Sequence, residues 1–213
     1  RSMTFNAENI NADSLMRMIS LLPQSNIAPG TDAGITIASG NAKVERISLG
    51  TIAANNVTSD FNLYNNLFKL NNISASAYGG KIVGKITYNL LYSSTGINLQ
   101  GRYLNANSAL FASTGMRNLM DGSLDFDAIN LTARGLTDTQ IMQSLKGKVK
   151  FIVSNGQMGA LGKLENLLYA QNILANNLLK TTMSAVVGAV KVKKTGEFKY
   201  IKGVVSLSNG WAT

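Results

Sequence analysis

An alternation of apolar and polar side chains with a period of two runs from residue 34 to residue 134, and it restricts the fold more than any other feature. Such a period places one set of side chains on each face of a β-strand. Pairs of small turn-forming residues, such as Asn55-Asn56 and Gly79-Gly80, interrupt the alternation at regular intervals. Short strands joined by short turns predict a curved, mostly antiparallel β-sheet arranged as a meander.

The segment Ser123–Arg134 keeps the alternation but changes its phase once. Its apolar residues occupy even positions up to Ala128 and odd positions from Ile129 onward. A strand with one extra residue relative to its partner shows such a change, because the side chains beyond the extra residue switch faces. We therefore predict a β-bulge close to these two residues.

Helical spacing of apolar residues occurs outside this region. It predicts helices, the first one capped by Asn11 or Asp13, at Asp13–Leu22, Thr137–Leu145 and Leu161–Leu179. Alternation predicts further strands at Lys148–Ser154, Val190–Val192, Phe198–Ile201 and Val204–Leu207. We expect a single α+β domain over residues 1–213, with a few helices packed on one face of the sheet. Its parts are an N-terminal helix and turn (1–33), antiparallel strands (34–134) and a helix–strand–helix segment with closing strands (135–213).

The composition removes most catalytic chemistry. The 213 residues contain no His and no Cys, so the usual acid–base group near neutral pH and the thiolate nucleophile are missing. Asp121, Asp125 and Asp127 lack the spacing of a calcium-binding loop. Ser144 and Lys148 lack the spacing of a Ser–Lys nucleophile pair. We expect a protein that is not an enzyme and that binds no metal or cofactor.

Positive charge is concentrated toward the C-terminal end of the chain. The formal charge is +9, and residues 141–213 contribute +8 through ten Lys and two Glu. A Lys-rich region can contact an anionic membrane surface, whereas Lys on strands can also protect sheet edges from pairing. The lack of interleaved Arg and aromatic residues argues against nucleic acid as a partner. The candidate contacts with anionic head groups are Lys146, Lys148, Lys150, Lys191, Lys193 and Lys194.

Several short motifs occur in an order and spacing that are typical of one family. They are Ala75–Ile86 with its Tyr-Gly-Gly turn, Asp121–Phe126, Ala133–Gly135, Gln143–Val149 and Ser208–Gly210. Together they resemble the C-terminal region of the AsmA family of bacterial envelope proteins. The resemblance covers residues 34–213, and the chain ends at Trp211–Thr213 where the family usually continues into further strands.

The resemblance implies both a location and a role. It implies a periplasmic protein that is tethered by an inner-membrane anchor helix upstream of Arg1. It also implies a part in outer-membrane assembly and lipid homeostasis, through a curved β-sheet groove of the kind that conducts phospholipid between membranes. Other envelope proteins would then be possible partners. No cofactor or catalytic residue is known for the family.

An apolar sheet face must be covered, either by other parts of the chain or by another molecule. The acyl chains of a phospholipid would serve, because each buried CH₂ contributes about 0.8 kcal/mol. The alternation does not separate a lipid-lined face from a dry core, so a structural or protein-interaction module of the envelope stays as the alternative. The candidate lipid-binding residues are Ile82, Ile86, Tyr88, Ile97, Leu99, Leu124 and Phe126.

Overall fold

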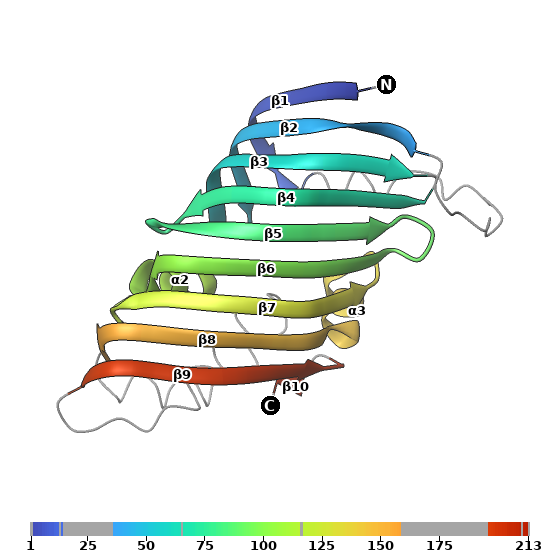
Figure 1. Cartoon of the computed structure of the whole chain (residues 1–213). Helices are drawn as coiled ribbons and strands as arrows, with labels where there is room; N and C mark the ends of the chain where they lie inside the picture. Colours follow the sequence, from blue (N-terminus) through green and yellow to red (C-terminus); the bar gives the residue numbers. More distant parts are fainter. Residues whose placement is uncertain are drawn as a thin grey trace.

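The computed structural model describes residues 2–12, 14, 36–64, 66–115, 117–158, 196–209 and 211–212. In this part of the chain ten strands form one open sheet in sequence order (Figure 1). Each strand from β2 to β10 pairs antiparallel with its sequence neighbour, so the predicted meander is confirmed. The strands are β1 (Ser2–Asn11), β2 (Thr36–Leu49), β3 (Ile52–Tyr64), β4 (Leu67–Ala77), β5 (Gly80–Asn89), β6 (Ser94–Asn105), β7 (Ser123–Arg134), β8 (Lys146–Gln157), β9 (Glu197–Ser208) and β10 (Trp211–Ala212).

The first strand was not predicted. Residues Ser2–Asn11, which the sequence assigns to an N-terminal helix and turn, form β1 and pair parallel with β2. Ser14 donates its backbone N–H to Asn11 Oδ1 at 3.0 Å, which is the geometry of the predicted Asn11 cap. Apart from Ser14, the predicted helix Asp13–Leu22 lies outside the described residues.

Bulges occupied by Asn interrupt several strands. The turn predicted at Asn55-Asn56 is wrong, because β3 continues through these residues from Ile52 to Tyr64. Asn56, Asn72, Asn130 and Asn155 have φ values of 51°, 51°, 49° and 50°, a left-handed region that Asn tolerates better than most residues. The register shifts beside three of them, and the shift between Ile129 and Thr132 in β7 confirms the predicted bulge. In Figure 1 the strands β1, β2 and β3 bend away from the others at one end, so the sheet is curved.

Two short helices lie at opposite ends of the strands in Figure 1. Helix α2 (Ala106–Thr114) is capped by Asn105, whose side chain accepts the Ser108 N–H at 2.8 Å. Helix α3 (Asp138–Ser144) falls within the predicted Thr137–Leu145. The other predicted elements of this region, Leu161–Leu179 and Val190–Val192, lie outside the described residues.

Strand β9 is continuous, whereas the sequence predicts two separate strands, Phe198–Ile201 and Val204–Leu207. Strand β9 passes through Gly203 without a break, because the register pairs Gly203 with Phe151 of β8. A Cβ atom at Gly203 would lie 2.5 Å from Phe151 Cζ, so the aromatic ring covers the glycine directly. An aromatic side chain over a glycine on a neighbouring strand stabilises a position that β-propensity alone disfavours.

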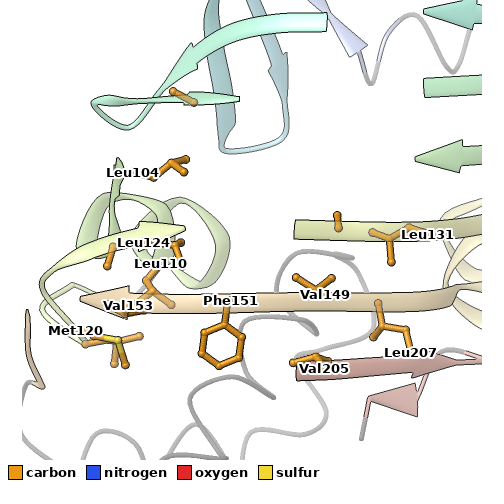
Figure 2. Packing of buried hydrophobic residues seen from close by; sticks show 14 of the residues in the cluster. Leu104, Leu110, Met120, Leu124, Leu131, Val149, Phe151, Val153, Val205 and Leu207 are labelled. Atoms are coloured by element: carbon orange, nitrogen blue, oxygen red, sulfur yellow. The ribbon is translucent and has the colours of Figure 1, made fainter. Parts of the chain in front are cut away.

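The largest cluster of buried apolar residues joins β6, β7, β8 and β9 to α2. Leu110 of α2 is 1% exposed, and Val153 of β8 is 2% exposed. In Figure 2 one part of this cluster, including Leu124 and Val153, lies next to the helix, whereas Val149, Val205 and Leu207 lie farther along the strands. Its labelled members are Leu104, Leu110, Met120, Leu124, Leu131, Val149, Phe151, Val153, Val205 and Leu207.

Candidate functional site

The predicted lipid-binding residues all lie on one face of the sheet. The antiparallel register aligns Ile86 with Ile97 across β5 and β6, and it aligns Leu99 with Ala128 and Leu124 with Val153 farther on. Since directly paired residues point to the same side of a sheet, these rows belong to a single surface. We call it the apolar face, and it contains the predicted Ile82, Ile86, Tyr88, Ile97, Leu99, Leu124 and Phe126.

The apolar face divides into two halves according to how well protein covers it. In the half formed by β6 to β9, which we call the closed half, Val149, Phe151 and Val205 are at most 7% exposed. In the half formed by β1 to β5, which we call the open half, Val44 and Ile73 are 3% and 8% exposed, but the neighbouring rings of Phe61 and Phe68 are only half-buried. The same face therefore carries a tightly packed cluster at one side and partly exposed large apolar side chains at the other.

The predicted residues fall on both sides of this division. Leu124 belongs to the buried cluster, and its partly buried neighbours Ile82, Ile97, Leu99 and Phe126 pack against that cluster. Ile86 and Tyr88 are half-buried and lie outside the cluster, at the end of β5 away from α2. Ile86 and Tyr88 are therefore the two predicted residues that lie in the open half and do not pack against the cluster.

Several residues of the open half were not predicted as site residues. The register pairs Leu70 with both Ile86 and Phe61, and it pairs Phe68 with Tyr88 and Leu63. These residues lie in the region 34–134 where the sequence predicts strands, and extending the alternation across the Asn72 bulge would have placed them on the apolar face. The face continues onto β1, where Met3 and Phe5 pair with Gly40 and Ala42 and are 54% and 48% exposed.

Glycines keep the middle of the apolar face flat. A Cβ at Gly101 would lie 2.2 Å from Phe126 Cε1, and one at Gly84 would lie 2.9 Å from Leu99 Cδ2. The neighbouring side chains therefore lie across the glycine backbone rather than beside another side chain. This packing leaves a smooth apolar floor between the two halves.

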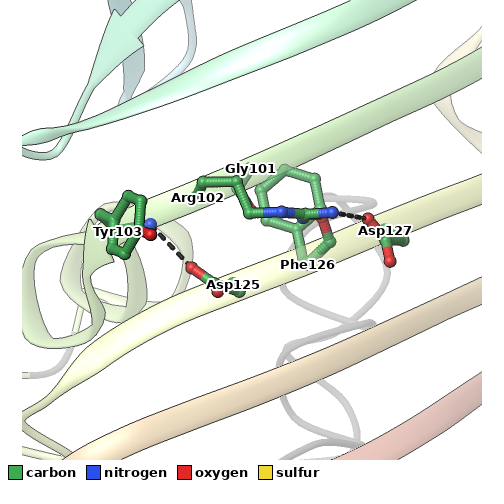
Figure 3. A network of polar contacts seen from close by, with 6 residues as sticks. All are labelled: Gly101, Arg102, Tyr103, Asp125, Phe126 and Asp127. Atoms are coloured by element: carbon green, nitrogen blue, oxygen red, sulfur yellow. Dashed lines mark hydrogen bonds and ion pairs between the residues drawn. The ribbon is translucent and has the colours of Figure 1, made fainter.

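The opposite face, which we call the outer face, is polar and tied together across β6 and β7. Arg102 forms an ion pair with Asp127 at 2.6 Å and donates from Nη1 to the carbonyl oxygens of Gly101 and Phe126, each at 2.8 Å (Figure 3). Asp125 Oδ1 accepts the backbone N–H of Tyr103 at 2.7 Å. Both carboxylates thus hold the register of the bulged β6–β7 pair. Among the described residues, no group of three acidic side chains has the geometry of a metal site.

The lysines predicted to contact anionic head groups lie on this outer face or outside the described residues. Lys148 and Lys150 alternate with the buried Val149 and Phe151, so they point away from the apolar face. Lys146 is exposed at the beginning of β8, next to α3. The other three candidates, Lys191, Lys193 and Lys194, lie outside the described residues.

The Tyr-Gly-Gly motif forms the tight turn between β4 and β5. Tyr78 and Gly79 have φ values of 50° and 76°, as a hairpin turn with two left-handed residues requires. The Tyr78 hydroxyl is buried and makes no hydrogen bond of good geometry to the described residues. Burial raises the pKa of Tyr78 above its usual value, despite the opposing effect of the nearby Ala53 backbone. The phenol therefore stays neutral and acts as part of the core.

Comparison with known families identifies the family to which this chain belongs. The family model of the AsmA family matches residues 4–213. The chain belongs to the AsmA family. Comparisons with curated proteins and with solved structures give no match.

The AsmA-family match is longer than the resemblance seen in the motifs, because it begins within β1 instead of at residue 34. Membership of the AsmA family indicates a role in envelope or outer-membrane assembly. In this AsmA-family chain, none of the described helices is long and apolar enough to cross a bilayer.

Proposed function

We propose that this AsmA-family chain binds phospholipid acyl chains along the open half of its apolar face. The observation that carries the proposal is the incomplete cover of that half, where Phe61, Leu63, Phe68, Leu70 and Tyr88 are half-buried on a continuous apolar surface. Exposed apolar patches of this kind mark binding surfaces in soluble domains. The proposal places the protein in the periplasm, tethered to the inner membrane, where it takes part in phospholipid transport.

The energy of binding would come from the burial of hydrocarbon. Each CH₂ removed from water contributes about 0.8 kcal/mol, so an acyl chain laid along several strands gains far more than any single polar contact supplies. Over Gly84 and Gly101 the side chains of Leu99 and Phe126 fill the space, so an acyl chain would lie on these side chains and not in a hollow at the glycines. Binding of this kind needs no catalytic step and no cofactor, in keeping with a chain that has no His and no Cys.

Native mass spectrometry of the purified chain tests the proposal. The expected result is co-purified phospholipid on the wild-type protein and roughly tenfold weaker loading of labelled phospholipid on the Phe68→Ser variant, since a large part of one apolar contact is lost. Ile152→Ser is the matched control, because Ile152 is 46% exposed on the outer face. Wild-type protein that is free of lipid and also rejects labelled phospholipid would contradict the proposal.

A structural or protein-interaction role is the alternative. Strand β1 supports it, because its second edge has no partner strand within the described part of the chain and can pair with another extended segment. The two roles differ in the lipid-loading experiment. A protein partner bound through β1 would leave the Phe68→Ser variant and the wild type indistinguishable.

A further inference from the structure

Three chain connections lie together at the end of the sheet where β5 and β7 finish (Figure 1). Leu90 donates its backbone N–H to the Asn66 carbonyl at 2.8 Å, which joins the β5–β6 turn to the β3–β4 turn. Gly135 donates to the Ser93 carbonyl at 2.9 Å, which joins the same turn to the segment after β7. The described residues of these connections, 64, 66–69, 89–94 and 134–137, form one edge that we call the turn rim.

The turn rim exposes large apolar side chains next to cations. Leu90, Tyr92 and Leu136 are 39%, 48% and 41% exposed. The Arg134 guanidinium lies 5.6 Å from the centre of the Tyr92 ring and donates from Nε to the Tyr92 carbonyl at 3.2 Å. Lys69 Nζ lies 4.8 Å from the centre of the Tyr64 ring in the neighbouring connection. The rim therefore combines Leu, Tyr and basic side chains in a structure that contacts within the protein hold in place.

Charge separates this rim from the other end of the sheet. The opposite end also exposes apolar side chains, such as Leu49 at 40% and Phe111 at 39%, and the Arg117 guanidinium lies 4.5 Å from the centre of the Phe111 ring. The difference is that the opposite end also carries the carboxylates of Asp121 and Glu197. The three connections of the turn rim contain Lys69 and Arg134 and no acidic residue; the next carboxylate in the chain is that of Asp138. A surface of this composition complements an anionic, partly apolar partner.

We propose that the turn rim docks on the surface of an anionic phospholipid bilayer. Tyr and basic side chains are suited to the head-group region, where aromatic rings rest at the interface and cations meet lipid phosphates. Leu90 and Leu136 would enter the acyl boundary beneath them. The inference goes beyond acyl-chain binding, because it names the end of the sheet that meets a membrane.

The position of the rim connects it with the open half of the apolar face. Tyr88 lies two residues before Leu90, and Phe68 lies next to Lys69. A bilayer that contacts the rim would therefore lie close to the accessible part of the apolar face. The predicted head-group contact Lys146 begins β8 at this same end, whereas Lys148 and Lys150 continue along the outer face, away from the rim.

Vesicle flotation of the full chain tests this docking. The vesicles contain phosphatidylcholine alone, or equal parts of phosphatidylcholine and phosphatidylglycerol. We expect binding to the anionic vesicles that weakens with added salt. The Leu90→Ser/Leu136→Ser variant should bind roughly tenfold more weakly because its inserted hydrocarbon is lost. The Lys69→Gln/Arg134→Gln variant should bind about thirtyfold more weakly, since each basic residue near an anionic surface strengthens binding about fivefold.

Matched variants at the opposite end serve as controls. Leu49→Ser/Phe111→Ser removes equally exposed apolar side chains, and Lys81→Gln/Lys199→Gln removes two exposed charges. Both should float like the wild type. Wild-type protein that does not float with anionic vesicles would overturn the inference, and so would equal losses in the rim and control variants or equal binding to both vesicle types.

The same variants keep this inference distinct from the proposed acyl-chain binding. Rim variants should load labelled phospholipid as the wild type does, as measured by native mass spectrometry. Phe68→Ser should lose that loading and still float with anionic vesicles. If the rim variants lost both lipid loading and flotation, the inference that the turn rim is a docking site separate from the acyl-chain site would be overturned.

Discussion

The closed and open halves of the apolar face are built from the same alternation of side chains, yet the aromatic side chains on them are covered to different extents. In the closed half, Phe151 is 5% exposed, and α2 contributes Leu110 at 1%. In the open half, Phe61 and Phe68 stay half-buried, and on β1 Phe5 is 48% exposed. The sequence pattern of a strand therefore determines which side chains share a face, whereas the burial of those side chains depends on parts of the chain that are distant in sequence.

The largest expected effect contrasts one aromatic residue from each half. Phe151→Ala should lower the free energy of unfolding by about 3–5 kcal/mol, because it leaves a cavity in a tightly packed cluster. Phe68→Ala should lower it by about 1 kcal/mol or less, because its ring already contacts solvent. Urea unfolding followed by circular dichroism measures both. Equal losses would show that the open half is also a closed core, and the comparison would fail.

The boundary between the halves should be sensitive to added volume. Gly101→Val should destabilise the protein by about 1–3 kcal/mol, because the new side chain collides with the Phe126 ring, 2.2 Å from the Cβ position. Thermal unfolding measures the loss. Gln100→Val, at the exposed neighbouring position that points to the outer face, is the control and should change stability little. Tolerance of valine at both positions would contradict the close packing of the Phe126 ring over Gly101.

Backbone strain at the bulges should not depend on the half in which a bulge lies. Asn72 of the open half and Asn130 of the closed half have φ values of 51° and 49°. Replacement of either by Ala should cost about 1 kcal/mol, whereas replacement by Gly should be close to neutral. Chemical denaturation of the four variants measures this. A much larger cost at Asn130 alone would mean that cover, and not φ, sets its energy.

The smallest expected effect concerns the outer face. The Arg102–Asp127 pair is about one-third exposed on each side chain, at 39% and 33%, so solvent and salt screen it. A double-mutant cycle with Arg102→Met and Asp127→Asn should give a coupling of about 0.2–1 kcal/mol that falls as salt is added. A coupling that is several times larger and independent of salt would mark the outer face, too, as a structural core.

Much of the sheet could be predicted because alternation with period two is a local property. Most strands between residues 34 and 134, the bulge near Ala128 and helix α3 follow from the order of apolar residues, but the turn predicted at Asn55-Asn56 is a bulge inside β3. Strand β1 was missed even though Met3, Phe5 and Ala7 alternate, because its parallel pairing with β2 depends on the connection between them. The division of β9 at Gly203 was wrong because the Phe151 ring that covers the glycine comes from another strand.

The candidate site was predictable to the same extent. Alternation correctly gathered Ile82, Ile86, Tyr88 and their partners on one face. It did not distinguish Leu124, which is buried in the cluster, from Tyr88, which is accessible. That distinction depends on α2 and on neighbouring strands, whose contacts are not encoded in any single segment. The same limit applies to the lysines of β8, whose charge was evident from the sequence but whose outer-face orientation required the register.

Site-specific photo-crosslinking in bacterial cells tests the central claim most directly. A benzoyl-phenylalanine would replace Phe68 in the open half, Phe151 in the closed half and Tyr200, which is 59% exposed on the outer face. After irradiation, mass spectrometry of the purified protein would detect any attached phospholipid. We expect a lipid adduct at position 68 and none at positions 151 and 200. No adduct at position 68, or equal adducts at positions 68 and 200, would contradict an apolar face that is open to lipid.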